Sequence, residues 1–176
     1  IYAGFGNYDS VANQKLEKIE TMLRLNVEAL VVLSSLFVHD YQNIEGSKLI
    51  NISSAGGYTI VPNAVTYCAS KFFVSTFTEG LARELQESKA KLQAKVLAPA
   101  ATRTNFGNVA NNIEAYDYDK SFGTYHTSKE MADFLLQLHD SNEVVGAVSR
   151  ESFEFELKSP LFDYAGNPKH NQSVTL

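Results

Sequence analysis

The sequence has few of the residues that mark disulfide-linked, metal-binding or secreted proteins. It contains one cysteine, Cys68, so no disulfide can form within the chain, and a reducing compartment is indicated. Its 4 histidines are scattered without the spacing of metal ligands, and we predict no metal site. No secretory signal is visible, and the expected location is cytoplasmic.

Basic clusters and long apolar runs are also missing. The formal net charge is -5 at pH 7, which argues against nucleic acid as a partner. The best apolar stretch, residues 27–38, is interrupted by Glu28, Ser34 and Ser35 and is too short to span a membrane. With 44% hydrophobic and 20% charged residues, the 176-residue chain has the composition and length of one globular domain.

Hydrophobic periodicity predicts alternating helices and strands. Apolar residues at three- and four-residue steps indicate helices, and short continuous or alternating apolar runs indicate strands. We expect helices at 13–39, 65–88 and 128–139, and strands at 48–53, 94–98 and 153–157. Thr127 and Glu130 form a capping box that opens the third helix. This alternation is typical of an α/β domain with a parallel sheet.

Two features of a dinucleotide-binding α/β domain are absent from the pattern. Three expected strands fall short of a doubly wound sheet, which has two βαβαβ halves. Gly4 and Gly6 open the chain, but the third glycine of the fingerprint would fall at Asp9. Residues 100–127 predict a long loop, which is either a substrate-side lid or a polar loop with a few packed aromatic residues.

Three side chains suggest proton transfer. Tyr67 and Lys71 stand four residues apart in the second expected helix and therefore share a face. Ser54 ends the strand-like segment 49–54. A phenol has a pKa near 10, and a neighbouring ammonium group favours its ionised form. Because acid–base catalysis works best near the working pH, the trio could protonate a carbonyl oxygen or deprotonate an alcohol.

The tyrosine–lysine spacing alone has little specificity. It recurs at Tyr116/Lys120 and at Tyr125/Lys129, where no hydroxyl stands at a strand end thirteen residues earlier. The context of Ser54 selects Tyr67. Cys68, next to it, is expected to be a small buried helix residue.

In order and spacing, three segments match one family: Asn51-Ile-Ser-Ser54, Tyr67-Cys-Ala-Ser-Lys71 and Leu97-Ala-Pro99. The chain resembles the short-chain dehydrogenase/reductase family, closely over residues 1–106 and loosely beyond. The resemblance implies a Rossmann-like doubly wound parallel sheet in a single partial domain, 1–176, truncated on its N-terminal side. It also implies NAD or NADP as cofactor, a small-molecule carbonyl or alcohol substrate, and a homo-oligomer.

The resemblance also implies roles for individual residues. Tyr67 is the expected acid/base, Ser54 orients the substrate carbonyl, and Lys71 lowers the tyrosine pKa and holds the nicotinamide ribose. Asn26 completes a proton relay, although an exposed mid-helix asparagine is the open alternative. The positions expected beside the cofactor are Tyr67 and Lys71 together with Ala3, Gly4, Pro99, Thr102 and Thr104.

Two positions depart from the family pattern. Tyr2 stands where the family has asparagine, and Ala100 stands where it has glycine. The expected function is an NAD(P)-dependent oxidoreductase that moves hydride between nicotinamide and a carbonyl or secondary alcohol. The alternative is a truncated, inactive family member that acts as an interaction module or remnant.

Overall fold

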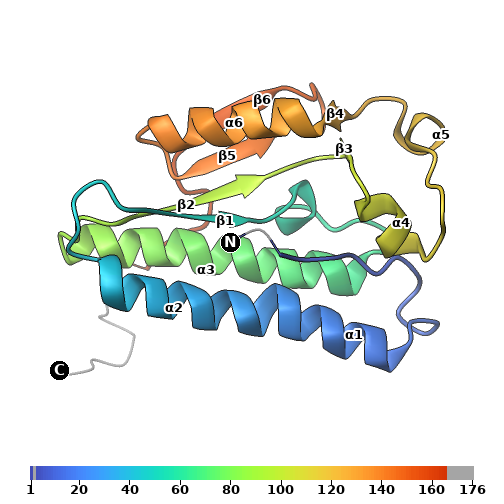
Figure 1. Cartoon of the computed structure of the whole chain (residues 1–176), viewed down its shortest axis with the longest axis horizontal. Helices are drawn as coiled ribbons and strands as arrows, with labels where there is room; N and C mark the ends of the chain where they lie inside the picture. Colours follow the sequence, from blue (N-terminus) through green and yellow to red (C-terminus); the bar gives the residue numbers. More distant parts are fainter. Residues whose placement is uncertain (2, 166–176) are drawn as a thin grey trace.

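A computed structural model describes residue 1 and residues 3–165, and in it helices cover both faces of a four-stranded sheet (Figure 1). The helices are α1 (Leu16–Leu23), the π-helical η1 (Arg24–Ala29), α2 (Leu30–Tyr41), the 3-10 turn η2 (Ala55–Gly57), α3 (Val65–Glu87), α4 (Phe106–Asn111), α5 (Tyr118–Phe122) and α6 (Ser128–Asp140). The strands are β1 (Lys48–Ile52), β2 (Gln93–Ala98), β3 (Thr102–Arg103), β4 (His126–Thr127), β5 (Val145–Val148) and β6 (Phe155–Lys158).

The main sheet has the order β1-β2-β5-β6. β1, β2 and β5 run parallel, and β6 closes the sheet as an antiparallel edge strand. On the other side of β1, the Ile52 amide donates to the carbonyl of Ile1, so the first residue lies alongside β1. β2 is buried from its second residue onward, as expected for a strand covered on both faces.

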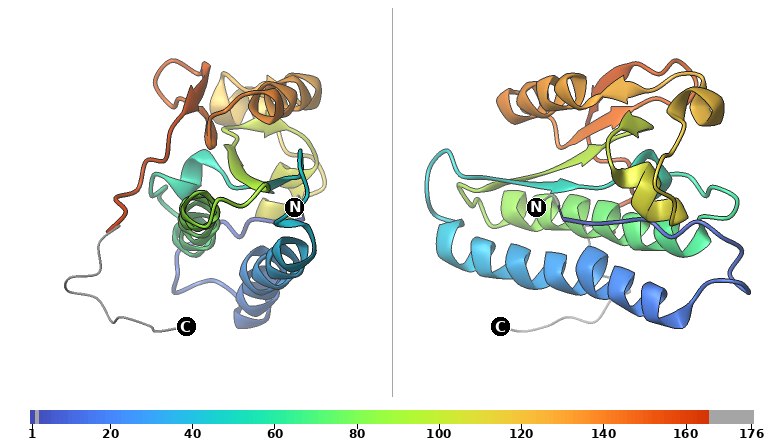
Figure 2. Two further views of the ribbon diagram at one scale, coloured as in Figure 1. Left: turned by 90° about the vertical axis from the view of Figure 1, so that its left-hand side faces the viewer. Right: turned by 45° about the vertical axis from the view of Figure 1, so that its right-hand side comes forward.

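The helices form two layers. Figure 2 shows α3 and the long α1–α2 helix on one side of the sheet and α6 on the other. The main core lies between α3 and the sheet, where Leu85 of α3 packs with Leu49 of β1, Val96 of β2 and Val145 of β5. The two layers confirm the predicted α/β architecture.

The first expected helix is one continuous run from α1 through η1 to α2. Met22, Asn26, Leu30 and Ser34 are buried at intervals of four residues and form one stripe. This run packs on α3 and β1. An 18-residue window of this 26-residue helix has a mean hydropathy of 1.6, which is apolar enough to cross a membrane, whereas the expectation from sequence considered only residues 27–38. Length and composition alone do not establish a span, since the core helix of a soluble protein and a signal sequence meet the same criterion.

Two expectations for the second half of the chain are wrong in part. The long loop at 100–127 contains α4 and α5, and its ends pair as the parallel strands β3 and β4. The sequence analysis also did not predict β5, a four-residue strand that includes Gly146. A Cβ on Gly146 would lie 2.9 Å from the Phe155 ring, so the glycine lets β6 pack closely. The strand expected at 153–157 begins two residues later, and the capping box of Thr127 and Glu130 is confirmed.

Gly57 is needed for the close contact between the end of β1 and α3. A Cβ at this position would lie 2.2 Å from Ser53 Oγ, 2.6 Å from Ser75 Oγ and 2.7 Å from the Lys71 carbonyl oxygen. Ser53 Oγ in turn lies 3.0 Å from that carbonyl oxygen and 2.6 Å from Ser75 Oγ. The turn after β1 is thereby fixed against the second and third turns of α3.

Replacing Gly57 by alanine is expected to lower the free energy of unfolding by about 2–3 kcal/mol, because the added methyl has no room. The matched control is Gly80→Ala, since no heavy atom lies within 4 Å of a Cβ at Gly80. This control lies inside α3 and should gain about 0.5–1 kcal/mol from better helix propensity. Urea unfolding followed by circular dichroism measures both, and a Gly57→Ala variant as stable as the parent chain would contradict the close packing.

Candidate active site

The carboxyl ends of β1 and β2 meet at one edge of the sheet, where ligands bind in open α/β sheets. Beyond β1, the Ser53 amide donates to the Leu97 carbonyl at 2.7 Å, and the Ala55 amide donates to the Pro99 carbonyl at 2.7 Å. Ser54 stands between them in extended conformation and accepts a hydrogen bond of 3.0 Å from the Gly56 amide through Oγ. That contact orients the hydroxyl and leaves its proton free to donate.

Tyr67 and Lys71 lie on consecutive turns of α3 and are each 6% exposed. The Lys71 ammonium donates to the Ile52 carbonyl at 2.9 Å and lies 6.0 Å from the centre of the Tyr67 ring. On the other side, Ser54 is close enough to the Tyr67 hydroxyl to lower its pKa, and a Cβ on Gly56 would lie 3.4 Å from Ser54 Oγ and 3.7 Å from Tyr67 Cε1. The structure therefore brings Ser54, Tyr67 and Lys71 together at the end of β1, as the sequence predicts.

Burial shifts the pKa values of Tyr67 and Lys71. Burial raises the pKa of Tyr67 from 10.0 to about 12, the nearby Ser54 hydroxyl acts in the opposite direction, and Cys68 raises it further. Burial also lowers the pKa of Lys71 from 10.5 to about 8. Desolvation of the phenol is the largest cause of the Tyr67 shift, and the expected lowering of the tyrosine pKa by Lys71 stays a prediction.

Two aromatic rings that the sequence did not single out cover Tyr67. The ring of Tyr8 meets it edge-on at 5.8 Å between centroids, and the ring of Phe106, the first residue of α4, lies at 5.6 Å. These two rings also contact each other at 6.2 Å. Burial raises the pKa of Tyr8 as well. No sequence signal marks this pair, since one ring comes from the N-terminal segment and the other from an unexpected helix.

Asn26 lies in the π-helical turn η1 and is 1% exposed, so the alternative of an exposed mid-helix residue is wrong. Its side-chain amide donates to the Phe5 carbonyl at 3.0 Å and to Ser70 Oγ at 3.1 Å, and its Oδ1 accepts from the Phe5 amide at 3.2 Å. Ser70 Oγ donates to the Tyr67 carbonyl at 2.7 Å. Asn26 thus ties the N-terminal segment to the start of α3, and its part in a proton relay stays a prediction.

Gly4 has no side chain and therefore leaves space beside the Lys71 ammonium. A Cβ on Gly4 would lie 3.0 Å from Asn26 Oδ1 and 3.4 Å from Lys71 Nζ. The preceding residue, Ala3, is exposed. Tyr2, the position that departs from the family asparagine, lies outside the described residues.

In the segment after β2, the threonine hydroxyls form hydrogen bonds with backbone groups two residues away. Thr102 Oγ1 donates to the Ala100 carbonyl at 3.0 Å, and Thr104 Oγ1 accepts from the Phe106 amide at 3.2 Å. Pro99 supplies the carbonyl that holds the turn after Ser54. These contacts shape the path into α4, and contact of Pro99, Thr102 and Thr104 with a cofactor stays a prediction.

Within residues 1 and 3–165, no group of three His, Cys, Asp or Glu side chains could hold a metal ion. Cys68 is buried and free, as expected for a small helix residue. The side chains that converge at the site carry a hydroxyl, a phenol and an ammonium group.

Removing the buried charge at Lys71 is expected to stabilise the fold. Because the pKa is lowered from 10.5 to about 8, the unfolded chain binds more protons than the folded chain between these values, and stability rises with pH across that window. Lys71→Met should raise the free energy of unfolding at pH 7 by about 1–2 kcal/mol, after discounting the lost hydrogen bond to Ile52. The gain should shrink as the pH approaches 10.5.

Urea unfolding at pH 7 and at pH 9.5 measures this difference. Lys89→Met, which changes an exposed lysine, is the control and should leave stability nearly unchanged at both pH values. A Lys71→Met variant less stable than the parent chain at pH 7 would show that the ammonium contributes more through its contacts than it costs through desolvation.

Comparison with known proteins places these residues in one family. The family model described as short chain dehydrogenase matches residues 2–114. "Dehydrogenase/reductase SDR family member 11" of Gallus gallus is 30% identical over 129 residues, which are 71% of this chain and 49% of the relative. "Dehydrogenase/reductase SDR family member 4" of Sus scrofa is 31% identical over 105 residues, 60% of this chain and 36% of the relative.

Solved structures show the same fold. The short-chain dehydrogenase from Sphingobium yanoikuyae, in complex with NADPH, superimposes with a TM-score of 0.67 at 28% identity, over 81% of this chain and 53% of the other. A dehydrogenase from Escherichia coli CFT073, complexed with NADPH, gives 0.65 at 25% identity over 80% and 55%. This chain thus spans about half the length of the relatives it matches, and its Rossmann-like fold is the corresponding part of theirs. The chain belongs to the short-chain dehydrogenase family.

Proposed function

We propose that this chain carries the proton-transfer part of an NAD(P)-dependent oxidoreductase that interconverts a small-molecule carbonyl and a secondary alcohol. The observation that supports it is the convergence of Ser54, Tyr67 and Lys71 at the carboxyl ends of β1 and β2, in a chain of this family. We further propose a cytoplasmic location, which fits the buried free thiol of Cys68.

Each side chain has a distinct part in this proposal. The Ser54 hydroxyl, oriented by the Gly56 amide, donates to the substrate oxygen. The Tyr67 hydroxyl transfers the proton. With a pKa of about 12 the phenol carries its proton at neutral pH and can donate it to a carbonyl oxygen during reduction.

The residues around Lys71 fit the nicotinamide end of a cofactor. An ammonium group has three donors, and within the described chain one of them is used on the Ile52 carbonyl. The bare backbone of Gly4 lets a further group approach the ammonium, and the proposed lining continues through Ala3, Pro99, Thr102 and Thr104. When bound, such a cofactor supplies the hydride. The solved relatives named above hold NADPH, which supports this assignment.

A second candidate function is an inactive interaction module. The observation that favours it is that two aromatic rings cover Tyr67. Cofactor binding separates the two candidates. Calorimetric titration of the chain with NADPH and NADH should give binding under the first proposal, and absence of binding by a folded chain would favour the module.

Tyr67→Phe is expected to lower kcat/KM for carbonyl reduction by about a hundredfold or more, because it removes the proposed proton donor and leaves the ring in place. Cofactor affinity should change little. Tyr125→Phe is the matched control, since Tyr125 also precedes a lysine by four residues but hydrogen-bonds with Asp119 at the surface. Equal activity of Tyr67→Phe and the parent chain would remove Tyr67 from the mechanism.

We also propose that the chain forms a homo-oligomer through the helices on one face. α3 presents Phe73, 40% exposed and stacked on Phe77, beside an apolar groove that continues to Leu81. α2 presents Leu33 and Leu36, which are 52% and 58% exposed. Apolar surface of this kind marks association sites.

Phe73→Glu is expected to shift the chain to its monomer, because a carboxylate in a buried apolar interface carries a large desolvation cost. Sedimentation velocity measures the shift. Leu136→Glu is the control, because Leu136 is 56% exposed on α6, on the other side of the sheet, and should leave the assembly unchanged. An unchanged sedimentation coefficient for Phe73→Glu would place the interface elsewhere.

A further inference from the structure

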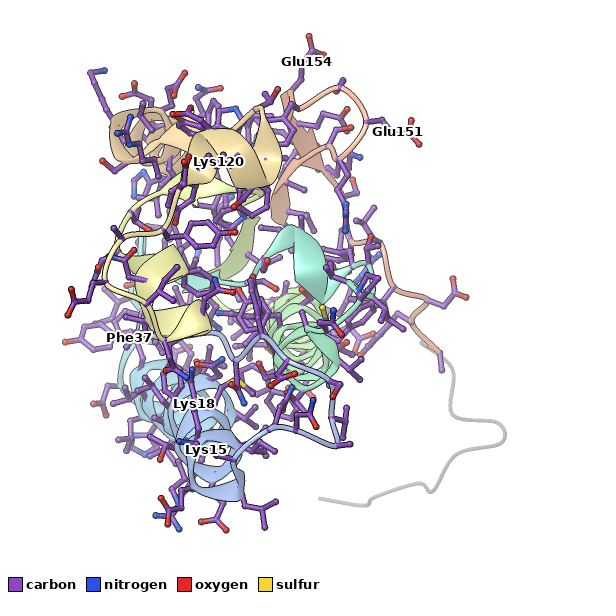
Figure 3. All side chains as sticks on the ribbon, turned by 90° about the vertical axis from the view of Figure 1, so that its right-hand side faces the viewer. Lys15, Lys18, Phe37, Lys120, Glu151 and Glu154 are labelled. Atoms are coloured by element: carbon purple, nitrogen blue, oxygen red, sulfur yellow. The ribbon has the colours of Figure 1, made fainter. Side chains whose placement is uncertain are left out.

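Lys18 of α1 connects two parts of the chain that lie far apart in the sequence. Its ammonium donates to the carbonyls of Val109 and Ala110 at 3.1 and 3.4 Å and to Asn112 Oδ1 at 3.0 Å. All three acceptors stand at the C-terminal end of α4. Figure 3 shows Lys18 between the helix that carries it and α4. Its pKa is lowered by partial burial and by the charge of Lys15.

The end of α4 suits a cation. The last carbonyls of a helix lack partners within the helix and carry the negative end of its dipole. Asn112 follows α4 in the left-handed conformation, with φ 55°, and turns its side-chain oxygen toward the same ammonium. The Lys18 ammonium therefore supplies hydrogen-bond donors to two of the last carbonyls of α4 and to Asn112 Oδ1.

The position of α4 decides what lies over Tyr67. The Tyr8 amide donates to the Ala110 carbonyl at 3.2 Å, which joins the last turn of α4 to the N-terminal segment. Gly6 allows this approach, since a Cβ there would lie 2.9 Å from Phe106 Cζ and 3.1 Å from Ala110 Cβ. Docked in this way, α4 presses Phe106 against Tyr67.

The other end of α4 is held separately. The Tyr118 hydroxyl accepts from the Gly107 amide at 3.1 Å and donates to the Thr104 carbonyl at 3.2 Å. The N-terminal end of α4 is thus anchored to α5, while its C-terminal end is held by Lys18, by the Tyr8 amide and by the buried side chain of Ala110. Release of the C-terminal end would let the helix pivot about its anchored end and lift Phe106.

We propose that Lys18 is a positioning residue that latches α4 closed over Tyr67, so that release of this latch opens the path of substrate to the phenol. The inference deepens the proposed function, because it assigns control of access to the same tyrosine. The covering rings and the latch are nonetheless physical features that can be tested without any enzymatic activity.

Nitration of Tyr67 by tetranitromethane, quantified by mass spectrometry of its peptide, measures access to the phenol. Lys18→Met should raise the Tyr67 nitration rate about five- to tenfold, because it removes charge-assisted hydrogen bonds at a partly exposed site. Lys18→Arg, which keeps the charge, should restore a rate near that of the parent chain. Asn112→Gly removes one acceptor, keeps the left-handed backbone and should give a smaller rise.

Three controls make the result specific. Lys15→Met changes the exposed lysine near the start of the same helix and should leave the rate unchanged. Tyr58, half-buried and bound to Glu79 at 2.6 Å, reports general loosening within each variant. Phe106→Ala removes the cover directly and must expose Tyr67.

An unchanged rate in both Lys18→Met and Asn112→Gly would overturn the latch, and so would an equal rise at Tyr58. An unchanged rate in Phe106→Ala would overturn the cover itself. A raised Tyr67 rate in a chain that binds neither NADPH nor NADH supports the latch while the proposed function fails, which keeps the two conclusions separate.

Discussion

The contact between the end of β1 and the first turns of α3 is the constraint on which the site depends. Ser53 Oγ meets the Lys71 carbonyl, the Lys71 ammonium returns to the Ile52 carbonyl, and Gly57 leaves the space for both. Lys71, a residue of the candidate site, therefore joins the end of β1 to α3 through both its carbonyl and its ammonium group. Any shift of α3 along the sheet moves Tyr67 and Lys71 relative to Ser54, which ties the chemistry to the packing of the core.

Desolvation shifts the pKa values of both titratable groups of this site. Burial raises the pKa of Tyr67 to about 12 and lowers that of Lys71 to about 8, so both groups favour their neutral forms. At neutral pH the phenol keeps its proton and the amine remains an ammonium. Stabilising changes can reduce activity where a site needs a destabilised group. The gain in stability expected for Lys71→Met is therefore consistent with the proposed role of Lys71.

Sequence reasoning found the parts of the site that depend on local spacing. Tyr67 and Lys71 share a helix face by their four-residue step, and the capping box of Thr127 and Glu130 is a local motif. The missed parts depend on long-range contacts: Lys18 meets the end of α4 more than ninety residues later in the chain. β5 was not predicted because four residues that include a glycine show too little hydrophobic periodicity. The short helices within residues 100–127 were not predicted because packing rather than helix propensity stabilises them.

The cover over Tyr67 links the packing of the domain to its proposed chemistry. Tyr8 and Phe106 cover the Tyr67 phenol, and under the proposed function a substrate oxygen reaches both Tyr67 and Ser54. The proposed chemistry therefore requires the cover to open. The short helix α4 is suited to that opening, because six residues anchored at two ends by a few polar contacts can move without disturbing the sheet. The rigid frame of β1 and α3 then keeps Ser54, Tyr67 and Lys71 in register while the cover moves.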